Sequence, residues 1–295
     1  MLPLFHVVFT MDCLPAATSR APGPRSWELS ARAISGFCTA LLDANLPVTL
    51  FLTPECAEIH GPLLEELAAE HVELGLLIHP QSLHGIKVSK HFGVLSRDVQ
   101  HRVGTHALQR FMDVVGSRPQ SVRPALFSAN DESFAVLSSL GFHQSSASNP
   151  GRRIAKEGAL WVGALPDAHY TSDHDRLNAG DLPLWELPVT SDALQEWRGR
   201  APDLCIDANN VRNWHRPLIE AQLARTARHE TPFRTLCFYT RNAFPYEHRQ
   251  DPARQNLEEL ISYLGELEER VAIQGATLRA AHGAYRSQAQ TSPIM

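Results

Sequence analysis

The chain has 295 residues, of which 43% are hydrophobic and 20% are charged, as is ordinary for a globular protein. Its formal net charge of −5 excludes the basic surface that nucleic-acid binding requires, and no apolar run approaches the roughly 18 residues of a membrane span. The five cysteines are scattered without a CxxC pair, which fits free thiols in a reducing compartment. The apolar start of the chain has neither a basic segment nor a cleavage signal. We therefore expect a cytoplasmic protein with no nucleic-acid partner and no membrane span.

A buried strand is predicted at residues 4–12, where a short apolar run containing Val7, Val8 and Phe9 ends in Asp12. Central strands of parallel sheets have this composition, and ligands of α/β proteins bind beyond the carboxyl ends of such strands. Asp12 would lie at that end and could take part in chemistry. The alternative is that Asp12 only caps the turn that follows the strand.

Apolar runs and amphipathic stretches alternate along the rest of the chain. After a Pro- and Gly-rich loop, we expect a helix from Ser30 to about residue 44. Further strands are expected at 48–52, 72–79, 121–127, 160–165, 182–189 and 235–239, and further helices at 53–68, 96–115, 130–140, 217–228 and 251–271. The residues after Tyr285 are expected to be loose. The alternation predicts βα units around a parallel sheet of about seven strands, in a single domain covering residues 1–295.

Polar side chains follow three of these strands, namely Asp12, His79 and Arg123. If the strands are parallel neighbours, all three residues lie on one rim of the sheet. A carboxylate with the imidazoles of His79 and His84 would suit Zn²⁺ or a similar divalent ion with positions left open for water. Arg123 could orient the carboxylate or bind an anionic substrate group. Simpler alternatives are a backbone hydrogen bond for His79, an exposed position for His84 and a structural ion pair for Arg123.

Five segments, in order, resemble motifs of the polysaccharide deacetylases, the NodB-like domain of carbohydrate esterase family four. The first three are FTMDCLP at 9–15, similar to TFDDGP; VTLFLT at 48–53, similar to ATFF; and ELG at 73–75 leading to HP at 79–80, similar to EIG and the histidine motif. The others are RPALF at 123–127 with LGF at 140–142 and SS at 145–146, similar to RPPY, LGF and DSS, and WELPV at 185–189, similar to EIPV. The resemblance covers about residues 4–190.

This resemblance implies an α/β fold in the form of a distorted (β/α) barrel of about seven parallel strands. It implies a metal-dependent carbohydrate N-deacetylase that removes an acetyl-like group from an amino sugar in surface-polysaccharide biosynthesis, with a divalent metal, most simply zinc. Asp12 and Arg123 would then be catalytic, and Asp12, His79 and His84 would hold the metal. Glu186 and Trp185 would contact the saccharide, although a strand-end ion pair and a buried position are the simpler alternatives for them.

The chain departs from the family's pattern at three places, and two of these departures, at Leu77 and Thr240, motivate a second hypothesis beside the enzyme. Aligning Pro15 with the family's proline makes Asp12 the base and places Cys13 at a ligand position, where a thiolate could bind zinc. Leu77 stands where the family has its first histidine, and Thr240 follows the late strand where the family has its acid. The loose candidates for that acid are His169, His174 and His215. The alternative is a catalytically impaired relative that binds a saccharide or a protein partner. If Asp12 is catalytic, Asp12→Asn is expected to leave the melting temperature nearly unchanged.

Overall fold

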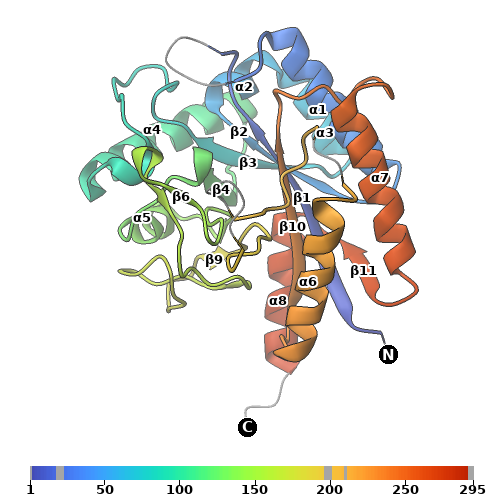
Figure 1. The fold of residues 1–295 in the computed structure, drawn as a ribbon. Coiled ribbons are helices and arrows are strands. Elements are labelled where there is room, and N and C mark those ends of the chain that lie inside the picture. The colour runs from blue at the N-terminus through green and yellow to red at the C-terminus, as the bar shows by residue number, and fades with distance from the viewer. Residues whose placement is uncertain (1, 18–22, 196–200, 209–210, 292–295) are drawn as a thin grey trace.

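One curled sheet organises the computed structural model, which describes residues 2–17, 23–195, 201–208 and 211–291 (Figure 1). Its strands follow the order β10-β1-β2-β3-β4-β5-β9-β8, with β11 also paired to β1. All neighbours are parallel except β8 and β9. The strands are β1 (Leu4–Cys13), β2 (Val48–Leu52), β3 (Glu73–Ile78), β4 (Ser121–Pro124), β5 (Gln144–Ser145), β8 (His169–Tyr170), β9 (Trp185–Glu186), β10 (Arg234–Arg241) and β11 (Ala272–Gly275). A separate antiparallel pair joins β6 (Arg153–Ile154) to β7 (Ala159–Leu160).

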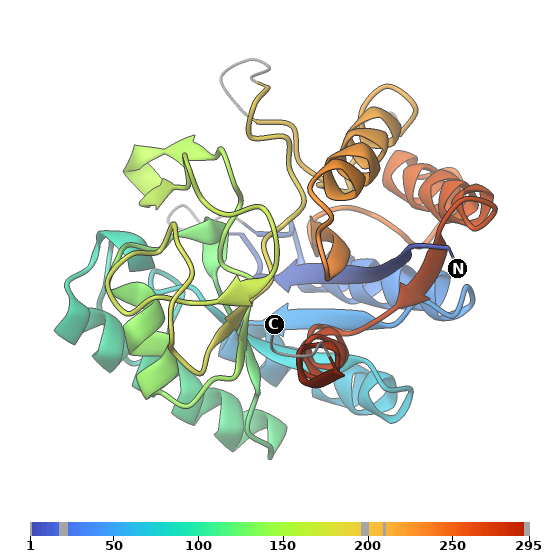
Figure 2. The same ribbon diagram turned by 90° about the horizontal axis from the view of Figure 1, so that it is seen from below.

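Helices lie around the outside of this sheet, as the view from below shows (Figure 2). They are α1 (Trp27–Leu42), α2 (Pro54–Ile59), α3 (Gly61–Ala69), α4 (Arg97–Val115), α5 (Ser133–Ser139), α6 (His215–Arg228), α7 (Pro252–Leu267) and α8 (Leu278–Thr291). Single turns of 3₁₀-helix are η1 (Phe92–Val94), η2 (Ala125–Phe127) and η3 (Ala155–Glu157). The predicted distorted (β/α) barrel is confirmed. Within the described residues, no helix combines the length and the apolar character needed to cross a bilayer.

Strand β1 pairs with three other strands and is buried in the wall of the barrel. Every residue of β1 after Leu4 is buried, because helices cover one face and the barrel interior covers the other. One edge of β1 pairs with β10 over its length, while the other edge pairs first with β11 and then with β2. Beyond β9, the Thr190 amide donates to the Cys237 carbonyl of β10 at 3.1 Å and brings the two ends of the sheet together. The carboxyl ends of the parallel strands therefore surround one mouth.

Several predicted element boundaries were wrong. Of the strands expected at 121–127, 160–165 and 182–189, only residues 121–124, 160 and 185–186 lie in strands. Helix α1 starts earlier than expected, because Ser26 is its N-cap and accepts a hydrogen bond from the Leu29 amide at 3.2 Å, whereas Ser30 is buried. The segment after Tyr285 was expected to be loose, but residues 286–291 form the second half of α8, and residues 292–295 lie outside the described part of the chain. In the same helix the ring of His282 stacks on Trp185 at 5.2 Å between centroids, and Tyr285 packs beside them. This aromatic contact holds α8 against the sheet, and no periodicity in the local sequence predicts it.

Candidate active site

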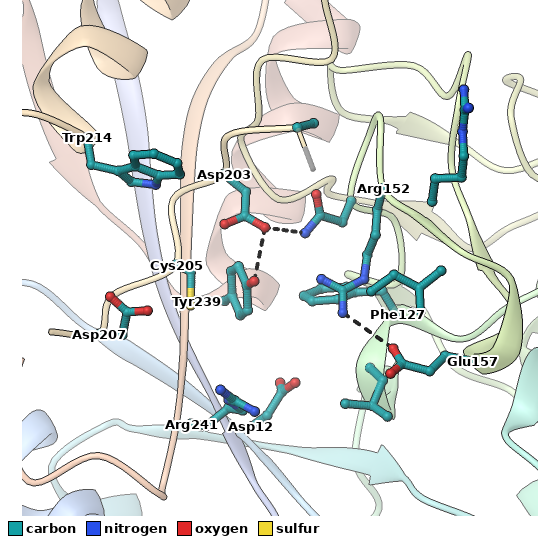
Figure 3. Close-up of a pocket in the computed structure, with 15 residues that line it drawn as sticks. Asp12, Phe127, Arg152, Glu157, Asp203, Cys205, Asp207, Trp214, Tyr239 and Arg241 are labelled. Carbon is teal, nitrogen blue, oxygen red and sulfur yellow. Dashed lines mark hydrogen bonds and ion pairs between the residues drawn. The ribbon is translucent and has the colours of Figure 1, made fainter. Parts of the chain in front are cut away.

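A cavity of about 580 Å³ opens at the carboxyl ends of the strands (Figure 3). Asp12 comes from the end of β1, Tyr239 and Arg241 come from β10, and Phe127 comes from the turn after β4. Loops between β5 and α6 supply the remaining wall, which includes Asn149, Arg152, Arg153, Glu157, Asp203, Cys205, Asp207 and Trp214. Charged and aromatic side chains from distant parts of the sequence therefore face one space.

The buried pair of Asp12 and Arg123 lies at the edge of this cavity. The Arg123 Nη1 donates to Asp12 Oδ1 at 2.7 Å and to Thr10 Oγ1 at 3.0 Å. Its Nε and Nη2 donate to the carbonyl and hydroxyl of Ser146 at 2.6 and 2.7 Å, and its Cζ lies 4.4 Å from the centroid of the Phe51 ring. Arg123 is 0% exposed and Asp12 is 4% exposed. All three nitrogens of the guanidinium thus donate hydrogen bonds, and the guanidinium holds the carboxylate in one orientation, with little solvent to screen the two charges.

A second carboxylate, Asp203, faces the same cavity. Its Oδ2 accepts hydrogen bonds from the Tyr239 hydroxyl at 3.0 Å and from Asn149 Nδ2 at 2.8 Å. Burial, with Asp203 adding to it, raises the pKa of Tyr239 well above its usual range. Burial also raises the pKa of the Cys205 thiol beside them. Tyr239 and Cys205 are therefore neutral at physiological pH, so the charges on this wall belong to the carboxylates and arginines.

Backbone strain is concentrated at the turn that follows β4. Leu126 and Phe127 have φ angles of 61° and 59°, in the left-handed region that residues with a bulky side chain rarely adopt. Both residues line the cavity. The Phe127 carbonyl accepts a hydrogen bond from Trp161 Nε1 at 2.7 Å, and its ring packs edge-on against Tyr239. Consecutive strained residues of this kind cluster at functional sites, where packing around them maintains the conformation.

The predicted metal ligands do not come together. In the strand register, Asp12 on β1 pairs with Phe51 on β2, and Phe51 pairs with Gly75 on β3. His79 therefore lies four residues further along the chain than Gly75, the position on β3 that corresponds to Asp12. His84 is exposed, and its backbone is held by Glu55 and His106. Among the residues that the structure describes, no group of three His, Cys, Asp or Glu side chains could hold a metal ion. The ligand set of Asp12, His79 and His84 is therefore not assembled.

The side chain of His79 is buried and only half satisfied. Ser82 Oγ donates to the His79 carbonyl at 3.2 Å, so the 2.8 Å contact between Ser82 Oγ and His79 Nδ1 is donated by the ring. The Nε2 lone pair has no hydrogen-bond partner. Burial, with a smaller effect of His91, lowers the pKa of His79 to about 4, so its ring is neutral at physiological pH.

The other positions that the family pattern assigns to a metal or an acid are also unsuitable. Successive side chains of a strand point to opposite faces, and Cys13 points away from Asp12 towards Cys56 and Cys38 on the helical side. Leu77 is part of the hydrophobic core, and Thr240 Oγ1 donates to the Ile206 carbonyl at 2.6 Å. The candidates for the late acid lie outside the cavity lining: His169, His174 and His215. The residues present therefore do not fit the divalent metal that the resemblance implies.

Glu186 and Trp185 also lie outside the lining of the cavity. Glu186 is buried, and its Oε1 accepts hydrogen bonds from the amides of Ala147 and Ser148 at 2.9 and 2.8 Å. Trp185 is buried against His282 of α8, as described above. These contacts give both residues a structural function: Glu186 anchors the loop after β5, and Trp185 anchors the C-terminal helix.

Sequence reasoning missed several residues of the cavity. Arg241 ends β10, two residues beyond the strand predicted at 235–239, and with the correct strand end the rule that pointed to Asp12 and Arg123 could have found it. Asp203 and Trp214 lie in an irregular segment, where neither periodicity nor a motif signals a functional residue. Only the fold brings this segment to the mouth of the barrel.

Comparisons with known proteins agree with this architecture. No family model and no curated protein matches the sequence. A provisionally assigned polysaccharide deacetylase from Mycobacterium smegmatis is similar in structure, with a TM-score of 0.63 and 17% identity over 100% of this chain and 94% of that chain. One from Pseudomonas aeruginosa PAO1 has a TM-score of 0.62 and 13% identity over 99% and 93%. The chain has the NodB-like polysaccharide deacetylase fold.

This deacetylase fold is not confined to deacetylases. A Puue allantoinase is similar with a TM-score of 0.63 and 10% identity, over 99% of this chain and 92% of that chain. At such identities the similarity concerns the fold, so function has to be argued from the site.

Proposed function

We propose that the protein is a carbohydrate N-deacetylase, an amide hydrolase that removes an acetyl-like group from an amino sugar. The observation that carries the proposal is the Asp12 carboxylate, which is held at the cavity by the buried Arg123 at 2.7 Å. The names of two structural neighbours, which refer to polysaccharide deacetylases, support the same reaction class. The substrate would be a sugar used in surface-polysaccharide assembly, and the reaction would take place in the cytoplasm.

In the proposed reaction, Asp12 is the general base. Its carboxylate takes a proton from water as the water oxygen adds to the amide carbonyl carbon. The C–N bond then breaks, and protonated Asp12 returns the proton to the leaving nitrogen, which gives a free amine and a carboxylic acid. Arg123 is a positioning residue, since each of its three nitrogens already donates to Asp12, Thr10 or Ser146. The resemblance predicts a zinc ion, but the residues do not fit it, and no step of this scheme uses one.

The composition of the cavity supports a sugar as substrate. Its volume of about 580 Å³ is in the range of small-molecule sites. Asp203 and Asn149 offer hydrogen-bonding groups to hydroxyls, and the rings of Trp214 and Phe127 offer surfaces on which the C–H faces of a pyranose can pack. The neighbouring allantoinase makes allantoin the natural competing substrate to test.

Acid release from a panel of compounds tests the proposal. The panel contains N-acetylated hexosamines, their nucleotide-linked forms, chitin oligosaccharides and allantoin, with product acid or ring opening measured by chromatography. We expect the wild-type protein to release acetate from an amino sugar, Asp12→Asn to release none, and the surface control Asp113→Asn to match wild type. If the protein opens the ring of allantoin and releases no acid from any amino sugar, the proposed substrate is wrong and allantoin takes its place. Saturable binding of an amino sugar without any hydrolysis would instead support a saccharide-binding protein that has lost its metal site. This alternative is motivated by the predicted metal ligands, which do not come together among the described residues.

A further inference from the structure

Arg241 lies next to the proposed base, Asp12, on the adjacent strand of the sheet. It ends β10 and is the register partner of Asp12 on β1. Both residues line the cavity, and the close-up shows the Arg241 guanidinium beside the Asp12 carboxylate (Figure 3). Parallel pairing of β1 with β10 fixes this proximity, so it does not depend on the conformation of a loop.

The donors of Arg241 are open, in contrast to those of Arg123. All three nitrogens of Arg123 donate to protein acceptors, and Arg152 forms an ion pair with Glu157 at 3.6 Å. Across the described part of the chain, no carboxylate pairs with Arg241, and none of its side-chain nitrogens donates a hydrogen bond to protein. Its Cζ lies 5.1 Å from the centroid of the Phe244 ring, which supports the side chain from one side. Arg153, the remaining arginine of the lining, is exposed.

An open cation beside a general base matches what amide hydrolysis requires. Addition of water to the carbonyl carbon places a full negative charge on the carbonyl oxygen, and donors aimed at that oxygen supply much of the catalysis in such reactions. A guanidinium has five N–H donors and keeps its charge at every physiological pH. The residues that would hold a metal for this purpose are not assembled, whereas Arg241 is already beside Asp12.

We infer that Arg241 is a catalytic residue that binds the oxyanion of the tetrahedral intermediate, so that the reaction needs no resident metal; this rests on the proposed function. As the water oxygen bonds to the carbonyl carbon, its proton goes to Asp12, and the carbonyl π electrons move to the oxygen that Arg241 holds. When the oxyanion re-forms the carbonyl, the C–N bond breaks and its electron pair takes the proton from Asp12. The substrate and one water become an amine and a carboxylic acid, with no other reactant.

Steady-state kinetics on the amino-sugar substrate give the first test. We expect Arg241→Gln to lower kcat about 100-fold with little change in KM, as for loss of an oxyanion donor. Arg241→Lys keeps the charge and should lose much less, and Arg102→Gln is the matched control, because Arg102 is an exposed arginine outside the cavity lining. Elemental analysis of the active protein should find no stoichiometric metal, and EDTA should not change kcat. Unchanged kcat in Arg241→Gln, or one zinc per chain whose removal abolishes turnover, would overturn the inference.

A binding measurement separates this inference from the proposed function. The probe is the methylphosphonamidate analogue of N-acetylglucosamine, whose tetrahedral anionic phosphorus replaces the acetyl carbon. Calorimetry with EDTA present should show that wild type binds the analogue more tightly than N-acetylglucosamine. Arg241→Gln should lose that preference while keeping its affinity for N-acetylglucosamine. Turnover by wild type without such a preference would refute the assignment of Arg241 alone, whereas absence of both turnover and preference would refute the proposed function with it.

Discussion

Replacement of Asp12 by Asn tests both the stability and the chemistry of the site. From the sequence, a catalytic Asp12 is expected to tolerate this substitution with hardly any change in melting temperature, and a large loss of stability would indicate a structural function. The structure changes that expectation, because Asp12 is the carboxylate within salt-bridge distance of a guanidinium that is 0% exposed. Asparagine can still accept a hydrogen bond from Arg123 Nη1, but the charge of Arg123 would be left without its counter-ion.

The size of the effect follows from this geometry. Removing one partner of a buried ion pair costs about 3–5 kcal/mol. Because the amide oxygen of Asn preserves the hydrogen bond, we expect the lower end, about 3 kcal/mol. With an unfolding entropy of about 2.1 cal/mol/K per residue, a chain of 295 residues loses about 5 °C in melting temperature for that energy.

Thermal denaturation and acid release on the same samples give the assay. Asp12→Asn should unfold about 5 °C below wild type and be inactive at temperatures where it is fully folded. Adding Arg123→Met removes the uncompensated charge, so the double variant should lose less stability than the sum of the two single variants. Equal melting temperatures for wild type and Asp12→Asn would refute the reasoning about the buried charge. Retained hydrolysis in folded Asp12→Asn would refute its function as the base.

Three further predictions follow from buried residues. Burial lowers the pKa of His79 from 6.5 to about 4, so the unfolded chain binds a proton there below about pH 6.5 while the folded protein does not. Stability should therefore fall by up to about 1.4 kcal/mol per pH unit from pH 6.5 to 4, and His79→Gln should flatten this slope in urea denaturation; parallel slopes would contradict it. Trp185→Ala should lower the free energy of unfolding by about 3–5 kcal/mol through lost packing, whereas Trp214→Ala should mainly raise KM. A raised KM with unchanged stability in Trp185→Ala would instead place Trp185 in the site. Cys13→Ala should keep kcat within about threefold, because the thiol points away from the cavity. It should lower the free energy of unfolding by about 1 kcal/mol through the small void. Loss of activity in a folded Cys13→Ala variant would show that Cys13 belongs to the site.

The sequence by itself determined the framework on which the site is built. The apolar run that ends at Asp12 is typical of a buried parallel strand, the segment that carries Arg123 is strand-like despite Pro124, and the order of the motifs implied the barrel through the family resemblance. Since the carboxyl ends of parallel strands meet at one mouth, the proximity of Asp12 and Arg123 could be predicted, and the 2.7 Å contact confirms it. Local patterns carry this information because strand formation and burial depend on neighbours in sequence.

Only the tertiary structure decided which side chains share the cavity. Strand register placed His79 beyond the level of Asp12, and the alternation of β1 turned Cys13 to the helical side, so motif positions that align in sequence do not meet in space. Register also placed Arg241 beside Asp12, although the two residues are far apart in the chain. These outcomes depend on contacts between distant segments, because a shift of one residue in pairing reverses the face to which a side chain points. A local sequence pattern does not contain that information.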